Sequence, residues 1–409
     1  MIMQDNEKKP ALRFKGFTDP WEQRKLDELG TIVTGSTPST TNDAYYADDG
    51  LLWVTPTDIT KNITCESARK LSASGQKVAR VVPRNTILVT CIASIGKNTM
   101  LANAGSFNQQ INGLTPDENK YVPYFLLTES VLWSAKMKVL AATGTLQIIN
   151  RTEFSEIKTF LPSFDEQKRI SQYFEKLDTL ITLHQRKYEK LVNIKKSMLD
   201  KMFPPNGVSV PEIRFKGFTD PWEQRKLDEI ANFSKGVGYS KNDLCEEGTP
   251  IILYGRLYTK YETSIFDVDT FVKEKAGSVY SKGGEVIVPA SGETAEDISI
   301  ASVVVKPGIL LGGDLNIVSP TTEYDSAFLA LTISSGATHK YLSSLAQGKS
   351  VVHLHNADIQ SVSAKFPTKR EQEKIHLLFG KIDTLITLHQ RKLEKLQNIK
   401  KSCLEKMFV

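Results

Sequence analysis

The chain has 409 residues, of which 40% are hydrophobic and 24% charged, as in an ordinary globular protein with room for two or three domains. Its net charge of +5 is too small to identify an acidic partner. A polar N-terminus, four scattered cysteines and no apolar run of about 20 residues predict neither export nor a membrane span, so we expect a cytoplasmic protein with free thiols.

Two segments of the chain occur twice. Residues 13–28 (RFKGFTDPWEQRKLDE) return unchanged at 214–229, and residues 176–203 return at 381–408 with 23 of 28 positions identical. The inserts that these repeats enclose share almost no run of identity. The pattern predicts one scaffold that carries two different surfaces, which suits recognition better than catalysis.

The repeats divide the chain into five segments. We expect an N-terminal repeat segment (1–28), a first insert (29–165), a central repeated region (166–229) with a long helix at 166–203, a second insert (230–370) and a C-terminal long helix (371–409). The inserts are predicted to be mixed α/β domains, with β-type runs at 51–55, 86–90, 251–254, 285–288 and 300–305 and helical stretches at 121–141 and 326–346. Both inserts end on a similar pattern, Ile148-Ile149-Asn150 and His353-Leu354-His355, which suggests that they share a fold.

The repeated helices carry apolar residues whose gaps alternate between four and three, as in a coiled coil. The strict spacing places Lys195 and Lys400 in the seam, and we expect the neighbouring Ile194 and Ile399 to occupy the seam in their place through a local drift of the helix. An antiparallel pair would relate the inserts by a pseudo-two-fold axis and bring His184 close to His389, either as tolerated polar residues or as a register device. The predicted core positions are Leu177, Ile181, His184, Leu191, Ile382, Ile386, His389 and Leu396.

Motifs for catalysis are weak. Residues 348–350 (Gly-Lys-Ser) resemble the end of a phosphate-binding loop, but Ser343 occupies the place of the first glycine and a helical stretch precedes them. His353 and His355 could chelate a metal, yet no third ligand is evident, and two surface imidazoles on a strand are the simpler interpretation. We therefore expect no catalytic residue, metal or cofactor on this chain.

Polar clusters in the inserts suit contacts with DNA. Amide, guanidinium and hydroxyl groups match base edges and phosphates, although each residue alone is equally compatible with a solvated loop. The candidates in the first insert are Thr37, Ser39, Thr40, Ser94, Lys97, Asn98, Gln109 and Gln110. Those in the second are Lys235, Lys241, Asn242, Tyr254, Arg256, Lys260, Ser291, Thr294, Lys349 and Ser350.

Over nearly its whole length the chain resembles the specificity subunits of type I restriction–modification systems. The resemblance rests on a W-E-x-x-K-L block at Trp21 and Trp222, a P-x-x-x-E-Q-x-x-I helix start at Pro162 and Pro367, a Gly-x-Thr-Pro-Ser run at 35–39 and an Asn-Gln-Gln run at 108–110. The second insert departs from the third pattern, with Gly-Val-Gly-Tyr-Ser at 236–240.

This resemblance implies two α/β target recognition domains joined by two long helices that form an antiparallel coiled coil. Each domain would read one half of a split sequence in double-stranded DNA, and the helices would set the spacer and dock two methyltransferase subunits. Those partners bind S-adenosylmethionine and methylate adenine, while restriction subunits use ATP and Mg²⁺. The alternatives are a non-catalytic, two-headed coiled-coil adaptor for proteins and a self-contained methyltransferase, which the missing motifs disfavour.

Overall fold

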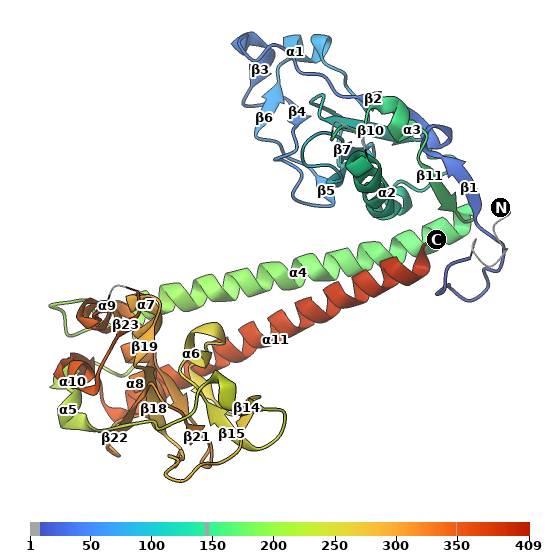
Figure 1. The fold of residues 1–409 in the computed structure, drawn as a ribbon. Coiled ribbons are helices and arrows are strands. Elements are labelled where there is room, and N and C mark those ends of the chain that lie inside the picture. Colours follow the sequence, from blue (N-terminus) through green and yellow to red (C-terminus); the bar gives the residue numbers. More distant parts are fainter. Residues whose placement is uncertain (1–8, 144–146, 349) are drawn as a thin grey trace. The chain divides into compact units, whose positions relative to one another are not determined.

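The computed structural model describes residues 9–143, 147–348 and 350–409 (Figure 1). The chain folds as two units: unit 1 contains the residues up to Leu183 together with 393–409, and unit 2 contains residues 184–392. Each unit holds one insert and part of each long helix, α4 (Phe164–Met202) and α11 (Lys369–Met407). No helix in the described part of the chain is long and apolar enough to cross a bilayer.

Unit 1 is built on a five-stranded sheet of order β2-β10-β7-β8-β5 and a four-stranded sheet of order β3-β6-β4-β9. One pair in each sheet is parallel, β5 with β8 and β4 with β9, and the other pairs are antiparallel. Strand β1, in the N-terminal repeat segment, pairs in a separate two-stranded ladder with β11, the strand that precedes α4. The elements are β1 (Glu22–Lys25), β2 (Gly30–Thr34), β3 (Tyr46–Ala47), β4 (Leu51–Val54), β5 (Ile63–Thr64), β6 (Arg69–Leu71), α1 (Ala73–Val78), β7 (Ile87–Thr90), β8 (Asn98–Leu101), β9 (Gly105–Phe107), β10 (Ile111–Pro116), α2 (Pro123–Thr143), α3 (Arg151–Ser155) and β11 (Lys158–Leu161).

Unit 2 repeats the two sheets and the ladder of unit 1 and adds a short pair of β19 with β23. Its five-stranded sheet has the order β13-β22-β18-β20-β16, its four-stranded sheet β14-β17-β15-β21, and β12 pairs with β24. The parallel pairs, β16 with β20 and β15 with β21, occupy the same places as in unit 1. The two inserts therefore share one fold, as their closing patterns predicted. The elements are β12 (Glu223–Lys226), α5 (Leu227–Ile230), β13 (Ala231–Lys235), β14 (Leu244–Cys245), β15 (Thr249–Ile252), α6 (Arg256–Thr259), β16 (Ser264–Ile265), β17 (Phe271–Val272), β18 (Glu285–Pro289), β19 (Ser291–Gly292), α7 (Ala295–Ile298), β20 (Ser302–Val304), β21 (Leu310–Leu311), β22 (Leu315–Pro320), α8 (Ser326–Ile333), α9 (Gly336–Leu345), β23 (Val352–His353), α10 (Asn356–Ser361) and β24 (Ser363–Phe366).

The sequence predicted one helical stretch late in each insert, and this is right only for unit 1. There α2 is a single helix, whereas the stretch at 326–346 in unit 2 forms two, α8 and α9. Gly336 has φ of +59°, a left-handed conformation that interrupts the α-helical hydrogen-bond ladder. The prediction of one continuous helix in unit 2 was therefore wrong.

The closing pattern of each insert is a helix cap. In unit 1 the Asn150 side chain accepts a hydrogen bond from the Glu153 backbone N–H, and the Glu153 carboxylate accepts one from the Asn150 backbone N–H, both at 2.9 Å. In unit 2 the Asp358 carboxylate likewise accepts from the His355 backbone N–H at 2.7 Å. These caps start α3 and α10 at the same point of the fold.

The seam of the long helices keeps its strict spacing at the two lysines. Lys195 binds Asp383 at 2.5 Å in unit 2, and Lys400 binds Asp178 at 2.5 Å in unit 1. The expected replacement of Lys195 by Ile194 was wrong, because Ile194 is 36% exposed. Ile399, next to Lys400, is half-buried and packs against the core of unit 1, as expected. An ion pair thus satisfies a seam position that an apolar residue would otherwise occupy.

Most seam residues are only half-buried. We expected Ile181, Leu191, Ile386 and Leu396 to be fully buried, but a seam between two helices stays open to water along both sides. Leu177 and Ile382 alone among the eight predicted positions are buried, and the half-buried ones are Ile181, His184, Leu191, Ile386, His389 and Leu396.

The two histidines of the seam meet in unit 2. Their Nδ1 atoms are 2.8 Å apart, and because Lys195 lies opposite Asp383 the two helices run antiparallel here. Partial burial and the charge of His389 lower the pKa of His184, which favours its neutral form. One neutral ring must accept the shared hydrogen bond, so this contact suits a register device better than a mere tolerated pair.

The end of each long helix closes the apolar core of one unit. In unit 1 the Phe408 ring stacks on Phe125 at 5.5 Å and meets Trp21 edge-on at 6.0 Å. In unit 2 Phe203, at the end of α4, stacks in the same way on the ring of Phe328 at 5.4 Å. Trp222 packs against Phe203 at 5.8 Å, in the place of Trp21.

A buried ion pair fixes the start of each long helix. Arg13 donates two hydrogen bonds to Glu166, both at 2.7 Å, and Arg214 donates two to Glu371 at 2.8 Å. The side chains of both glutamates are at most 1% exposed. Removing one partner of such a pair would leave an uncompensated buried charge, which costs roughly 3–5 kcal/mol. This geometry explains why the arginines and glutamates recur in both copies.

Replacing Phe408 by alanine should lower the free energy of unfolding by about 3–5 kcal/mol, because it removes the ring that closes the unit 1 core. Leu388→Ala is the control, since this leucine is 45% exposed and its loss should cost about 0.5 kcal/mol or less. Urea unfolding followed by tryptophan fluorescence measures both. Equal losses for the two variants would contradict the packing described.

Candidate nucleic-acid interface

One end of the unit 1 sheets gathers the polar loops of the first insert. The ladders place Thr34, at the end of β2, opposite Asn112, and Thr90, at the end of β7, opposite Ile111. Strands β2 and β7 therefore end where β10 and β8 begin. We call this end the loop edge of unit 1, and it comprises residues 35–42, 55–61, 91–97 and 108–110.

Unit 2 has a loop edge at the same place. There Lys235, at the end of β13, lies opposite Asn316, and Pro289, at the end of β18, lies opposite Leu315. The loop edge of unit 2 comprises residues 236–243, 253–262, 290–301 and 312–314. The same framework thus presents two different sets of loops.

All the candidates of the first insert lie at or beside the loop edge of unit 1. Gln109 is exposed and accepts a hydrogen bond from the Thr37 hydroxyl, which ties two loops together. Lys97 is exposed, with Nζ 3.4 Å from the carbonyl oxygen of Pro56. Asn98 instead points inward, because its amide donates to the Ser130 hydroxyl at 2.7 Å. The remaining candidates there are Ser39, Thr40, Ser94 and Gln110.

The candidates of the second insert separate into exposed and internal side chains. Arg256 is internal: its side chain is 9% exposed and forms ion pairs with Asp269 at 2.7 Å and Glu262 at 2.8 Å. Lys260 and Arg256 together lower the pKa of Asp269 to about 2. Ser291 is buried, so it cannot face a ligand as it lies. The exposed or half-buried candidates are Lys235, Lys241, Asn242, Tyr254, Lys260, Thr294 and Ser350, and Lys349 lies outside the described residues.

A glycine opens the first loop of each loop edge for a steric reason. A Cβ atom on Gly35 would lie 2.1 Å from the carbonyl oxygen of Asn108, and one on Gly236 would lie 1.9 Å from that of Gly312. No side chain fits at either distance. The loop sequences can therefore diverge after this glycine but not at it.

Arg80 contacts the loop edge of unit 1, which the sequence did not reveal. Its backbone N–H donates to the Ser36 hydroxyl at 2.8 Å, and its guanidinium donates to the carbonyl oxygen of Thr34. Arg80 is exposed and lies 44 residues from Ser36 in the chain. No local pattern could have linked the two positions.

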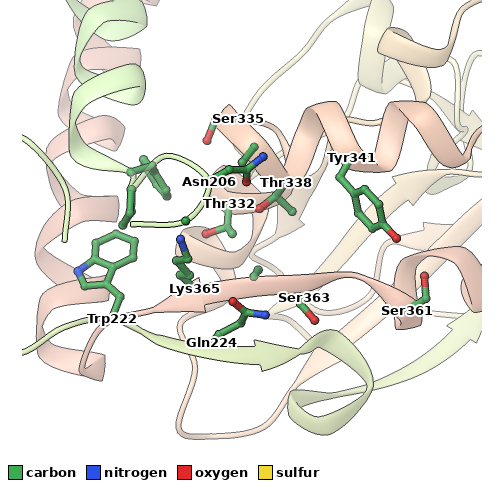
Figure 2. Close-up of a pocket in the computed structure, with 15 residues that line it drawn as sticks. Asn206, Trp222, Gln224, Thr332, Ser335, Thr338, Tyr341, Ser361, Ser363 and Lys365 are labelled. Atoms are coloured by element: carbon green, nitrogen blue, oxygen red, sulfur yellow. The ribbon is translucent and has the colours of Figure 1, made fainter. Parts of the chain in front are cut away.

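Unit 2 has a pocket of about 300 Å³ away from its loop edge (Figure 2). Hydroxyl side chains such as Thr332, Ser335 and Thr338 line it. Unit 1 packs Trp133 against Thr159 of β11 in the corresponding region, with a 3.1 Å hydrogen bond from the indole. Unit 1 has a pocket beside its own α2 and β11, lined by residues such as Lys136, Val139 and Lys158, so a pocket in this region does not distinguish the inserts.

The described residues contain no group of three His, Cys, Asp or Glu side chains placed to hold a metal ion. His353 and His355 have parallel rings 6.4 Å apart, without a third ligand among the residues described. Burial raises the pKa of the Cys91 thiol to about 11, which keeps it protonated and unreactive at neutral pH.

A family comparison decides the identity of the scaffold. A model described as "Type I restriction modification DNA specificity domain" matches residues 18–193 and again residues 219–398. The chain belongs to this family. Both matches begin in a repeated segment and end in a long helix, so the internal repeat is a repeat of the family domain.

Several specificity subunits are similar to the chain. The MjaVIII specificity subunit of Methanocaldococcus jannaschii is 23% identical over 98% of this chain and 95% of its own length. The HindI specificity subunit of Haemophilus influenzae is 30% identical, but the match covers only 38% of this chain and 36% of that protein. The crystal structure of a type I S subunit from M. genitalium has the same fold, with a TM-score of 0.63, 15% identity and coverage of 98% and 99%.

Exchanging Lys97 for alanine in this specificity-family chain should weaken DNA binding about equally for all sequences and reduce the slope of log K against log salt by about 1, as expected for a phosphate contact. Lys158→Ala is the matched control, because Lys158 is exposed on β11 outside the loop edge. Fluorescence anisotropy across a salt series measures both. Equal slopes for the two variants would remove Lys97 from the interface.

Proposed function

We propose that the chain is the DNA-recognition component of a type I restriction–modification complex. Its recognition domains, residues 29–165 and 230–370, would each read one half of a bipartite site in double-stranded DNA. The observation that carries this proposal is the pair of loop edges. The same arrangement of strands occurs in both units, but the loops at its edge carry different side chains in each. Membership of a specificity family supports recognition, and not catalysis, as the role of this chain.

The loop-edge chemistry suits DNA in both domains. In the first, the exposed amide of Gln109 can donate to and accept from adenine, while Lys97 can meet phosphate. In the second, the exposed side chains of Lys235, Lys241 and Asn242 offer the same two kinds of contact. Because the residues and their spacing differ, the two half-sites should differ in sequence.

The long helices would set the distance between the half-sites. Each has 39 residues, which corresponds to a length of about 58 Å at 1.5 Å per residue. The domains have width of their own, so we expect half-site centres about one turn of B-DNA apart, or roughly 34–36 Å.

The repeated helices would also dock two methyltransferase subunits. Leu180 and Leu183 on α4 are 42% and 43% exposed, and their counterparts Leu385 and Leu388 on α11 are 43% and 45% exposed. Exposed leucines three positions apart form an apolar strip into which a partner helix can pack. Since the strip occurs twice with the same sequence, it suits two copies of one partner.

The proposed complex divides its chemistry among the subunits. The methyltransferase partners would bind S-adenosylmethionine and methylate adenine, and restriction subunits would use ATP and Mg²⁺. This chain would determine which DNA sequence the complex binds, without a cofactor of its own. We place the complex in the cytoplasm, where double-stranded DNA would be accessible to it.

Replacing residues 30–161 by the matching insert of a relative should change one half-site and leave the other intact. The reason is that each domain carries its own loop edge on its own sheets. Sequencing of methylated DNA from cells that express the chimera with its methyltransferase partner reads both halves. A change in both halves, or in neither, would refute separate readout.

Changing Leu180 and Leu183 to lysine should reduce the bound methyltransferase from two copies to one, because one apolar strip is lost. The same change at Leu385 and Leu388 is the matched variant and should also leave one copy. Both should retain DNA binding by the isolated chain. Mass measurement of the purified complexes gives the stoichiometry, and two copies on either variant would rule out these strips as docking sites.

A further inference from the structure

Each long helix carries a lysine in its seam whose aspartate partner also binds a recognition domain. A seam lysine is unusual, since burying an ammonium group costs stability unless a partner compensates for it. Here the partner is Asp178 for Lys400 and Asp383 for Lys195. Both aspartates belong to the repeated segment, at equivalent positions.

In unit 1, Asp178 connects three elements through its two oxygens. Its Oδ1 lies 2.5 Å from Lys400 Nζ on α11. Its Oδ2 accepts hydrogen bonds from Asn62 Nδ2 at 2.8 Å and from the Tyr124 hydroxyl at 2.7 Å. Burial, together with the charge of Asp178, raises the pKa of Tyr124 far above its ordinary value, so the phenol remains a donor.

Asn62 belongs to the framework of the recognition domain. It directly precedes β5, the edge strand of the five-stranded sheet, and its carbonyl oxygen accepts from the Met100 backbone N–H at 2.9 Å and from the Thr99 hydroxyl at 3.2 Å. Tyr124 lies in α2, a helix that packs on the same sheet, and this tyrosine is only 7% exposed. The Asp178 contact therefore holds the sheet itself and not a peripheral loop.

Unit 2 has the same connection with fewer bonds. Asp383 Oδ1 lies 2.5 Å from Lys195 Nζ on α4, and its Oδ2 accepts from the Thr263 hydroxyl at 3.1 Å. Thr263 precedes β16, the strand that corresponds to β5, and its carbonyl oxygen accepts from the Val303 backbone N–H at 2.9 Å. The position that matches Tyr124 is Ala327, so unit 2 lacks the phenol contact.

We propose that Asp178 and Asp383 are positioning residues that lock each recognition domain to the register of the helix pair and so determine how strictly the spacer length is measured. Each of these carboxylates binds the seam lysine of the opposite helix with one oxygen and the edge of the sheet with the other. A shift in the register of the helices would therefore also move the recognition domain. This inference rests on the proposed function, because it refines how that function measures distance.

The inference separates spacer measurement from half-site readout. Both aspartates lie on the long helices, whereas bases would be read at the loop edges. Weakening the lock should let a domain rotate about the helices while its loops keep their shape. Sites with one base pair more or less between the halves should then be accepted, without any change in the half-site sequences.

Thr263→Val tests this most directly, because it removes the bond between Asp383 and the domain while leaving the pair with Lys195 intact. Asp383→Asn weakens both contacts of this residue, the one with Lys195 and the one with Thr263. Glu373→Gln is the control, since Glu373 is an exposed carboxylate on the same helix. Each variant is assembled with its methyltransferase partner and assayed on duplexes whose spacer is the native length, one base pair shorter or one longer.

We expect Thr263→Val and Asp383→Asn to raise the rate at the altered spacers, relative to the native spacer, by about tenfold, the factor that corresponds to losing a hydrogen bond to a charged group. Glu373→Gln should leave that ratio unchanged. A merely structural role would lower all three rates together. An unchanged ratio in Thr263→Val, with methylation at the native spacer retained, would overturn the proposal.

This result is separable from a failure of the proposed function. If the wild-type complex shows no preference for a bipartite site of fixed spacer, the function itself is contradicted. If the wild-type complex discriminates and Thr263→Val discriminates equally well, only the positioning role is contradicted. If Asp383→Asn does not assemble, Thr263→Val alone decides.

Discussion

The structure depends on aromatic rings at the ends of the two long helices. α4 begins in unit 1 and ends in unit 2, where Phe203 packs against Trp222; α11 does the reverse, and Phe408 packs against Trp21. Each α/β domain thus takes the last part of its core from a helix that began in the other unit. A recognition domain cannot lose that helix end without exposing its core, so the core of each unit depends on both long helices.

The repeated sequence lies where the framework needs identical contacts. Arg13 and Arg214 bind the first turns of the long helices, and the two tryptophans receive the helix ends. In both inserts equivalent strands pack against these repeated residues. The loops of the two inserts differ, and so do some of their buried residues. Burial raises the pKa of Glu129 in unit 1 to about 7, whereas unit 2 has Thr332 at the matching position. Two different recognition surfaces can therefore share one scaffold.

Local patterns in the sequence predicted much of this fold. The heptad spacing predicted the helix pair, and the shared positions of His184 and His389 predicted their contact. The matching patterns that close the two inserts, with Asn150 in one and His355 in the other, predicted a shared fold, and in the structure they cap α3 and α10. The break at Gly336 was not predicted, since glycine within a helical pattern does not show whether its φ is positive.

Long-range partners limited the prediction of the site. Lys195 keeps its seam position because Asp383 lies opposite it, 188 residues later in the chain. Arg256 looked like a DNA ligand, but carboxylates from a neighbouring loop hold it in the interior. Arg80 joined the loop edge without any local signal. The topology brings most of the polar candidates to the loop edges, while the direction of each side chain depends on partners that sequence spacing does not identify.

The most direct test of the account is single-molecule sequencing of methylated bases in DNA from cells that express the chain with its methyltransferase partner. We expect one motif made of two short, different, specific sequences separated by a non-specific spacer of constant length, with methylated adenine in both halves. A continuous motif, or a spacer of variable length, would contradict the account of two loop edges held at a fixed distance.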